Sequence, residues 1–280
     1  MEKIKLNNGI KMPQEGIGTY LLKPNEAYES VVEALNDGYR LIDTANIYGN
    51  IVSVGKAIKA SKIERKDIFV STKIWPSEYN DKDIVDKTLK RMNLDYIDLL
   101  FLHQPSKGFL EGYTTLINAY KEGKIKAIGL SNFEGKYIQE ILTKFDVIPQ
   151  VMQVECHPSY SQKELRKLLD KHDIHLMAWY PLGGKGNDSL LNNKTLKEIA
   201  IKYHKSVAQI IIKWHIQMGF IVIPGSKNKE HIKDNIAIDD FNLSSSDMDI
   251  INSLDSNKRF YTRTEEALNH FLTITPTYEE

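Results

Sequence analysis

Four side chains in the first half of the sequence, Asp43, Tyr48, Lys73 and His103, are of types that together can protonate a developing oxyanion. The phenol of Tyr48 is a poor acid on its own, because an ordinary tyrosine titrates near pH ~10. An ammonium group close to a phenol favours the phenolate, so we expect Lys73 to lower the pKa of Tyr48. A shift to near pH ~7 needs roughly 4 kcal/mol, which one close charge in a partly dry site can supply. Asp43 would keep Lys73 charged and in place, while His103 would donate a hydrogen bond to the substrate oxygen.

These residues can act together only if the fold brings together the segments that carry them. Asp43, Lys73 and His103 each stand at or near the end of a short run of apolar and β-branched residues. Runs of this kind recur along the chain, at residues 15–20, 39–44, 67–73, 96–103, 125–131, 151–156, 174–180 and 220–225. Between them lie segments with helical spacing, at residues 25–38, 81–93, 109–124, 162–172 and 193–204.

The alternation of these runs with helical segments predicts parallel strands joined by crossover helices, and hence an α/β fold. Eight such units in 280 residues favour one (β/α)8 TIM barrel, with residues 1–280 as a single domain. An open, doubly wound sheet is the alternative. Before the first unit, Asn8-Gly9 is a two-residue turn signal, which predicts an N-terminal β-hairpin that plugs the bottom of the barrel. Residues 243–254, in a C-terminal extension, predict a helix capped by Ser246 or a neighbouring serine.

A barrel of this kind gathers its chemistry at the carboxyl ends of the strands. Polar and aromatic residues at these ends are therefore candidates for the site, namely Asp43, Lys73, His103, Ser131, Asn132, Gln153, Glu155, Trp179, Tyr180, Pro224, Gly225 and Ser226. If the second, third and fourth strands are neighbours, Asp43, Lys73 and His103 face one pocket with Tyr48 above it. Residues 259–271 could close over a substrate there.

The composition argues against several classes of partner. Lys plus Arg and Asp plus Glu each number 37, and the net charge of zero gives no sign of a nucleic acid or an anionic membrane. The single cysteine, Cys156, allows no intrachain disulfide, and the polar start of the chain does not resemble a secretory segment. Charged residues break the longest apolar runs, so no membrane span is expected. We expect a cytoplasmic monomer.

Two other kinds of chemistry lack their motifs. No HExxH or paired-cysteine pattern is present, so no metal site is expected, and a metal-dependent barrel hydrolase is rejected. The segment that begins at Gly16 starts like a Rossmann dinucleotide fingerprint, but it lacks the third glycine.

The chain resembles the aldo-keto reductases over nearly its whole length. The resemblance is carried, in order and spacing, by "GIGTY", "RLIDTANIYGN", "VSTKIW", "LDYIDLLFLHQP", "IKAIGLSNF", "MQVECHPSY", "AWYPLGG" and "IVIPGSKNKEHIKDN". One such block would be a weak signal, whereas the full ordered series is highly specific. The likeness is greatest to bacterial-type members, such as 2,5-diketogluconate reductases, glyoxal reductases and prostaglandin F synthase-like enzymes.

The resemblance implies a barrel that binds a nicotinamide dinucleotide and reduces the carbonyl group of a small molecule, with Tyr48 as the general acid. The implied catalytic residues are Asp43, Tyr48, Lys73 and His103, the four found above from their chemistry. The implied cofactor contacts are Thr19, Asp43, Ser131, Asn132, Gln153, Trp179, Tyr180, Pro181, Leu182, Gly183, Ala208, Ile223, Pro224, Gly225, Ser226, Lys227, His231, Asp234 and Asn235. Of these, Ser131, Asn132 and Gln153 would hold the carboxamide, and Trp179 would stack on the nicotinamide ring. The substrate would be contacted by Tyr20, Tyr48, Trp75, His103 and Gln104.

Residues 223–235, which we call the phosphate loop, would bind the cofactor's phosphates. This loop departs from the pattern of the family. Gly225 and His231 stand where a lysine and an arginine commonly hold the 2′-phosphate of NADPH, while Lys227 and Lys229 could compensate in part. We therefore expect NADPH as cofactor, with NADH also accepted and a weaker preference than usual. The alternative function is a cofactor-binding regulatory subunit that senses redox state without turnover. The intact set of four catalytic residues favours the enzyme.

Overall fold

The computed structural model describes residues 2–184 and 186–279, and its centre is a sheet of eight parallel strands. The strands are β3 (Ile17–Gly18), β4 (Leu41–Asp43), β5 (Phe69–Ile74), β6 (Leu99–Leu102), β7 (Ile128–Ser131), β8 (Val151–Glu155), β9 (His175–Trp179) and β10 (Ile221–Val222). Each strand pairs with the next along the chain, so the spatial order follows the sequence. All eight predicted strands are present.

The sheet closes into a barrel because its first and last strands also meet. Gly16 N donates to Val222 O at 3.0 Å, and Gly18 N donates to Pro224 O at 3.2 Å. This closing seam, formed by residues 16–18 and 222–225, is tight. A Cβ atom added at Gly18 would lie 2.9 Å from Ile223 O, and one added at Gly225 would lie 2.9 Å from Gly18 O. The barrel, and not the open sheet, is therefore the correct prediction.

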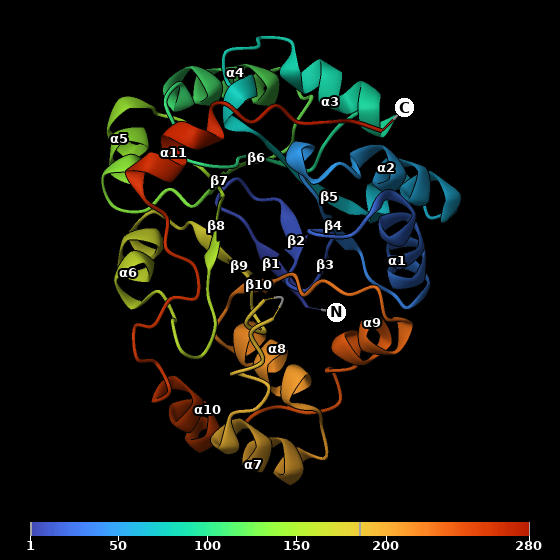
Figure 1. Cartoon of the computed structure of the whole chain (residues 1–280), viewed down its shortest axis with the longest axis vertical. Helices are drawn as coiled ribbons and strands as arrows, with labels where there is room; N and C mark the ends of the chain where they lie inside the picture. The colour runs from blue at the N-terminus through green and yellow to red at the C-terminus, as the bar shows by residue number, and fades with distance from the viewer. Residues whose placement is uncertain (1, 185, 280) are drawn as a thin grey trace.

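A ring of helices surrounds the strands (Figure 1). The helices are α1 (Pro24–Asn36), α2 (Ile51–Ala60), α3 (Ile84–Met92), α4 (Phe109–Lys121), α5 (Lys136–Lys144), α6 (Lys163–Lys171), α7 (Lys194–Tyr203), α8 (Val207–Gln217), α9 (Lys229–Ile236), α10 (Ser245–Asn252) and α11 (Glu265–Phe271). The six segments predicted as helices are confirmed, and the predicted serine cap of α10 is Ser244, which accepts a hydrogen bond from Asp247 N. Helical spacing in the sequence did not predict α2, α5, α8, α9 or α11. Among the described residues, no helix is both long and apolar enough to cross a membrane.

The N-terminal hairpin is present, but its turn differs from the predicted one. Strands β1 (Lys3–Lys5) and β2 (Lys11–Pro13) pair antiparallel. The predicted two-residue turn at Asn8-Gly9 is wrong, because Leu6 N donates to Ile10 O at 2.8 Å across a three-residue loop. Gly9 adopts a left-handed φ of 88°, as this longer type of loop requires, whereas a two-residue type I′ turn would also need a positive φ at the preceding residue.

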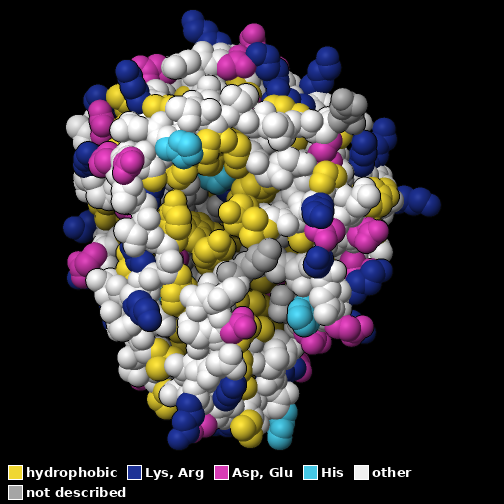
Figure 2. Space-filling view, in the orientation of Figure 1, with side chains coloured by type: hydrophobic (Ala, Val, Ile, Leu, Met, Phe, Trp, Pro, Cys, Tyr) yellow, Lys and Arg dark blue, Asp and Glu magenta, His cyan; other side chains and the backbone are white. Residues whose placement is uncertain are grey.

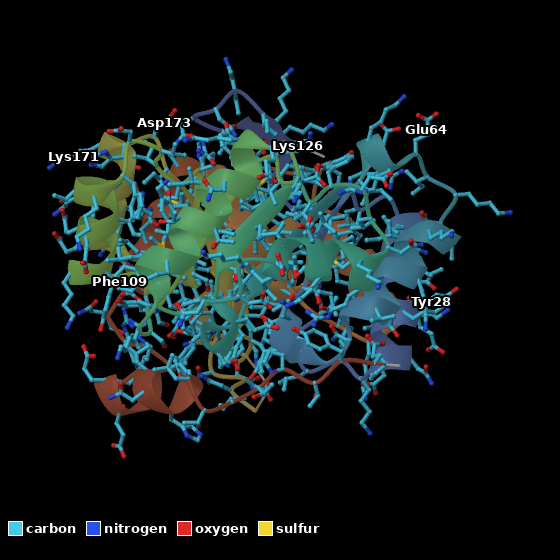
Figure 3. The ribbon with its side chains drawn as sticks, turned by 90° about the horizontal axis from the view of Figure 1, so that it is seen from above. Tyr28, Glu64, Phe109, Lys126, Lys171 and Asp173 are labelled. Atoms are coloured by element: carbon cyan, nitrogen blue, oxygen red, sulfur yellow. The ribbon has the colours of Figure 1, made fainter. Side chains whose placement is uncertain are left out.

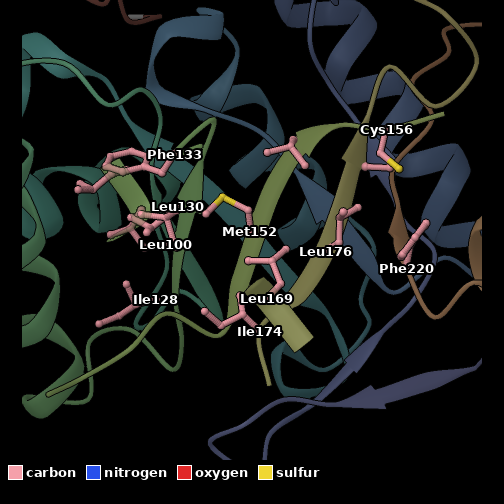
Figure 4. Packing of buried hydrophobic residues seen from close by; sticks show 14 of the residues in the cluster. Leu100, Ile128, Leu130, Phe133, Met152, Cys156, Leu169, Ile174, Leu176 and Phe220 are labelled. Carbon is pink, nitrogen blue, oxygen red and sulfur yellow. The ribbon is translucent and has the colours of Figure 1, made fainter. Parts of the chain in front are cut away.

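The strands bury both of their faces, which explains their nearly continuous apolar runs. Leu99 and Phe101 point into the barrel, whereas Leu100 and Leu102 pack outward under the helices. Figure 4 shows part of this outer layer, where Leu100, Leu130 and Met152 come from neighbouring strands. The hairpin's Leu6 and Met12 join the interior cluster, so the predicted plug is confirmed.

Replacing Leu6 with alanine is expected to destabilise the protein by about 2–5 kcal/mol, because Leu6 is 1% exposed and fills the bottom of the barrel. Urea unfolding of wild type and variant measures the difference. Ile4→Ala is the matched control, since Ile4 is only partly buried beside the same cluster, and a smaller loss is expected there. Equal losses in the two variants would show that the hairpin does not plug the barrel through Leu6.

Candidate active site

An ion pair lies at the carboxyl ends of β4 and β5, inside the barrel. Lys73 Nζ lies 2.5 Å from Asp43 Oδ2 and donates to Thr44 O at 2.8 Å. The other carboxylate oxygen of Asp43 accepts from Ser71 Oγ at 2.7 Å and from Gln153 Nε2 at 3.1 Å. Both charged side chains are almost fully buried, and the pair therefore has a fixed geometry without competing water.

Tyr48 stands beside this pair at the end of a single 3-10 turn, η1 (Asn46–Tyr48), which follows β4. Gly49 ends the turn with a left-handed φ of 66°, and α2 begins at Ile51. Lys73 Nζ lies 5.1 Å from the centre of the Tyr48 ring. The Tyr48 hydroxyl has no hydrogen bond within the described part of the chain, which leaves it free for a substrate oxygen.

The expectation that Lys73 lowers the pKa of Tyr48 is wrong for this chain. Burial, followed by the negative charge of Asp43 and the neighbouring Tyr20 and Tyr180, raises the pKa of Tyr48 well above its usual value. The physical reason is that burial disfavours the charged phenolate, and the carboxylate of Asp43, paired with Lys73, adds a negative charge near the phenol. The Tyr48 phenol is therefore protonated at neutral pH, which is the state a general acid requires.

His103 forms the opposite wall of the site, directly after β6. Its ring centre lies 5.8 Å from that of Tyr48, and its buried Nδ1 has no hydrogen-bond partner among the described residues. Burial, and then the charge of Lys73, lower the pKa of His103 well below its usual value. The imidazole is therefore neutral at pH ~7 and can donate through one ring N–H only.

The three remaining predicted substrate contacts lie beside Tyr48 or His103. Trp75 lies edge-on to His103 at 5.0 Å, and Tyr20 packs on Tyr48 at 5.0 Å, although half of Tyr20 is exposed. Gln104 is buried beside His103, and its Oε1 has no partner in the described residues. Figure 2 shows a hollow in this face of the molecule, with hydrophobic side chains around it and a histidine in its depth.

The predicted carboxamide contacts lie next to the catalytic residues. Asn132 Nδ2 donates to His103 O at 3.3 Å and to Ser131 Oγ at 3.2 Å, while Asn132 Oδ1 accepts from Trp179 Nε1 at 3.0 Å. Gln153 already touches Asp43. Hydroxyl and amide groups of this kind match the donors and acceptors of a nicotinamide carboxamide, so the residues fit the implied cofactor.

The other predicted cofactor residues continue this set around the rim. Thr19 donates from N and from Oγ1 to Asp43 O, at 3.0 and 3.1 Å. Tyr180, with a left-handed φ of 53°, begins the loop after β9. The same loop contains Pro181, Leu182 and Gly183, and the first turn of α8 contains Ala208. Strand β10 is followed by Ile223, Pro224, Gly225, Ser226 and Lys227. Helix α9 carries His231, Asp234 and Asn235. The hydrogen bond from Gly18 N to Pro224 O places the residues that follow β10 next to Thr19.

The phosphate loop carries its positive charges in ion pairs. Lys227 Nζ lies 2.9 Å from Glu26 of α1, and Lys229 Nζ lies 2.8 Å from Glu33 of the same helix. His231 is exposed on α9 and forms no ion pair among the described residues. A phosphate that binds here must therefore compete with the carboxylates of α1 for the lysines.

The end of the chain supplies a wall that sequence analysis identified only as a segment. Trp75 Nε1 donates to Phe271 O at 3.0 Å, and the rings of the two residues lie 5.1 Å apart. Figure 3 shows α11 at the opposite end of the barrel from Lys126 and Asp173, which lie just before β7 and β9. Phe271 itself was missed, because an aromatic residue in an extension carries no periodic signal of its own.

Within residues 2–184 and 186–279, no three or more His, Cys, Asp or Glu side chains are placed to hold a metal ion. Glu155 and His157, a buried pair with 3.0 Å between Oε1 and Nε2, instead accept and donate hydrogen bonds within the protein.

Comparison with known proteins gives one consistent result. Residues 16–256 match the model of the Aldo/keto reductase family. The chain is 41% identical over 272 residues to a glyoxal reductase of Bacillus subtilis, an alignment that covers 95% of this chain and 98% of that one. It is 37% identical over 262 residues to a methylglyoxal reductase of Escherichia coli K12, covering 91% and 94%. A solved aldo/keto reductase from Brucella melitensis superposes with a TM-score of 0.87 at 45% identity, covering 91% and 99%.

These alignments extend over most of each relative. The barrel also superposes on the solved structure of one of them. The chain therefore belongs to the aldo/keto reductase family and is an oxidoreductase that acts on carbonyl groups.

Proposed function

We propose that this protein reduces small aldehydes and ketones to alcohols, with Asp43, Tyr48, Lys73 and His103 as its catalytic residues. The observation that carries the proposal is the buried ion pair of Asp43 and Lys73 beside an unpaired phenol and a neutral imidazole. A bound nicotinamide cofactor would supply the hydride. The protein's own part is to hold the carbonyl oxygen and to protonate it.

Each residue has a separate task in this proposal. Tyr48 donates its hydroxyl proton to the carbonyl oxygen as negative charge develops there. His103 donates a hydrogen bond to the same oxygen, which orients the carbonyl and stabilises the charge. Lys73, held by Asp43, places a positive charge beneath the phenol and so stabilises the phenolate that remains after the proton has left.

We propose a small, reactive dicarbonyl as the substrate class. The support is the likeness to a glyoxal reductase and a methylglyoxal reductase, together with aromatic side chains at Tyr20, Trp75 and Phe271 around the catalytic residues. Oxidation of NADPH by the purified protein in the presence of methylglyoxal tests the function. A panel of other aldehydes and ketones then defines the range. Tight cofactor binding without oxidation of NADPH by any carbonyl would instead support a regulatory subunit.

We propose NADPH as the preferred cofactor, with NADH also used. The support is the pair of lysines near the start of α9, and the limit on the preference is that both lysines already contact carboxylates of α1. We also propose a cytoplasmic monomer without a nucleic-acid partner, on the basis of the zero net charge and the single, buried cysteine.

His231→Arg is expected to raise the ratio of kcat/KM for NADPH over NADH by about two- to tenfold, because it adds a permanent charge beside the 2′-phosphate. Steady-state kinetics with both cofactors measure the ratio. His204→Arg is the matched control, since His204 is an exposed histidine that ends α7 outside the phosphate loop. A ratio that stays at the wild-type value in His231→Arg would show that residue 231 does not face the phosphate.

A further inference from the structure

The segment after α11 runs along the rim of the barrel and reaches the turn that carries Tyr48. In Figure 1 it runs from α11 past α4 and α3 to the marked C-terminus near α2. Ser77 Oγ donates to Ile274 O at 2.8 Å, which fixes the middle of the segment. We call residues 272–279 the C-terminal strap.

The far end of the strap caps helix α2. The carboxylate of Glu279 accepts hydrogen bonds from Val52 N at 2.7 Å and from Ser53 N at 3.1 Å, and it also contacts the Ser53 hydroxyl. The amide groups in the first turn of a helix have no partners within the helix, and the helix dipole favours a negative charge there. Glu279 supplies both an acceptor for these amide groups and a negative charge, although it lies at the other end of the chain.

Helix α2 depends on this distant cap because its own capping residue is engaged elsewhere. Asn50, at the N-cap position, makes no capping hydrogen bond. Its Nδ2 donates to Thr19 O and Leu22 O, both at 2.9 Å, and its Oδ1 accepts from Thr44 Oγ1 at 3.0 Å. Asn50 therefore ties the loop after β3 to the end of β4, and the first turn of α2 is left to Glu279.

The strap also reaches the beginning of the Tyr48 turn. The Tyr278 hydroxyl donates to one carboxylate oxygen of Glu78, and Arg91 lies 3.5 Å above the Tyr278 ring. The second oxygen of Glu78 accepts from Asn46 Nδ2 at 2.9 Å. Asn46 is the first residue of the turn η1, and its Nδ2 also contacts Thr88 Oγ1 at 3.2 Å.

We propose that Tyr278 and Glu279 are positioning residues for the general acid, and this inference rests on the proposed role of Tyr48. The strap holds the turn from both sides: through Glu78 at Asn46, and through the first turn of α2 just beyond Gly49. Tyr48 lies between these two attachments. The strap therefore fixes the phenol relative to Lys73 and the carbonyl, and neither strap residue contacts the substrate itself.

Three variants and two controls separate this role from a general effect on folding. Glu279→Ala removes the cap, Glu279→Gln keeps an acceptor oxygen without the charge, and Tyr278→Phe removes one hydroxyl only. Glu266→Gln is the control for the lost carboxylate, since Glu266 is exposed on α11. For the tyrosine, Tyr96→Phe is the control, because Tyr96 also carries an arginine on its ring, at 4.1 Å, but lies before β6.

Enzyme kinetics and hydrogen exchange, both on the whole protein, test the positioning role. We expect kcat for methylglyoxal to fall about three- to tenfold in Glu279→Ala and less in Glu279→Gln and Tyr278→Phe, with KM and cofactor Kd within about twofold of wild type. A larger primary deuterium isotope effect on kcat would accompany the loss. Hydrogen exchange at the amides of Tyr48, Val52 and Ser53 should become about tenfold faster in Glu279→Ala and stay unchanged in both controls.

Unchanged exchange at these three amides in Glu279→Ala would overturn the cap. Faster exchange at Val52 and Ser53 with wild-type kcat, or a loss of kcat matched by an equal loss of cofactor affinity, would overturn the positioning role. If the wild type reduces no carbonyl, the proposed function fails. The exchange at Tyr48 then still shows whether the strap holds the turn.

Discussion

Tyr48→Phe is expected to lower kcat by about 10²- to 10⁴-fold while the Kd of the cofactor stays close to the wild-type value. The hydroxyl is the group that protonates the carbonyl oxygen, and it makes no hydrogen bond within the described part of the protein. Its removal therefore takes away an interaction that exists only in the transition state, and such a loss lowers kcat and kcat/KM together. Single-turnover reduction and cofactor titration measure the two quantities.

The control for this prediction is Tyr28→Phe, an exposed tyrosine on α1 that should leave kcat unchanged. Because burial raises the pKa of Tyr48, the phenol of the wild type stays protonated across neutral pH, and we expect kcat for reduction to be flat between about pH 6 and pH 8. Wild-type rates of reduction in Tyr48→Phe would mean that another group supplies the proton.

Lys73→Met is expected to remove most of the activity and also to destabilise the fold by about 3–5 kcal/mol. The ammonium is fully buried at 2.5 Å from Asp43, so its removal leaves an unpaired carboxylate inside the barrel. The remaining negative charge would raise the pKa of Tyr48 still further and make the phenolate less accessible in the transition state. Urea unfolding and steady-state kinetics give the two effects separately.

The double variant Asp43→Asn/Lys73→Met distinguishes the electrostatic role from the structural one. It removes both charges, so much of the lost stability should return, whereas the activity should stay low because no cation lies beneath the phenol. If the double variant recovers activity together with stability, Lys73 acts on the fold alone and not on the proton transfer.

The strands were predictable because each one is marked by its own apolar run in the sequence. The catalytic residues were predictable because they follow the ends of such runs. Runs such as residues 96–103 are apolar on both faces, as expected for strands covered on both sides. Since all the strands are parallel, their carboxyl ends meet at one rim, and this alone brings Asp43, Lys73 and His103 together. Helix α2 escaped prediction although it is no shorter than α3 or α6, and its own N-cap residue, Asn50, is committed to other contacts.

The electrostatics of the site could not be predicted from residue types. Sequence analysis correctly paired an acid with Lys73, but it assumed that the ammonium would act on the phenol more strongly than Asp43 does. Burial of the phenol, which residue types do not show, is the largest cause of the raised pKa of Tyr48, and the charge of Asp43 comes second. The capping of α2 by Glu279 was equally hidden, since 226 positions separate Glu279 from Ser53.

The glycines of the closing seam restrict how the cofactor preference of this protein can evolve or be redesigned. The resemblance to the family implies a phosphate-binding lysine at the position of Gly225. Any side chain there brings its Cβ within 2.9 Å of the backbone oxygen of Gly18, so the first step of that route loosens the barrel itself. Position 231 carries no such restriction, because it is exposed on a helix. If the proposed phosphate contacts hold, a substitution on α9 changes the cofactor preference at a lower cost to the fold than one in the loop after β10.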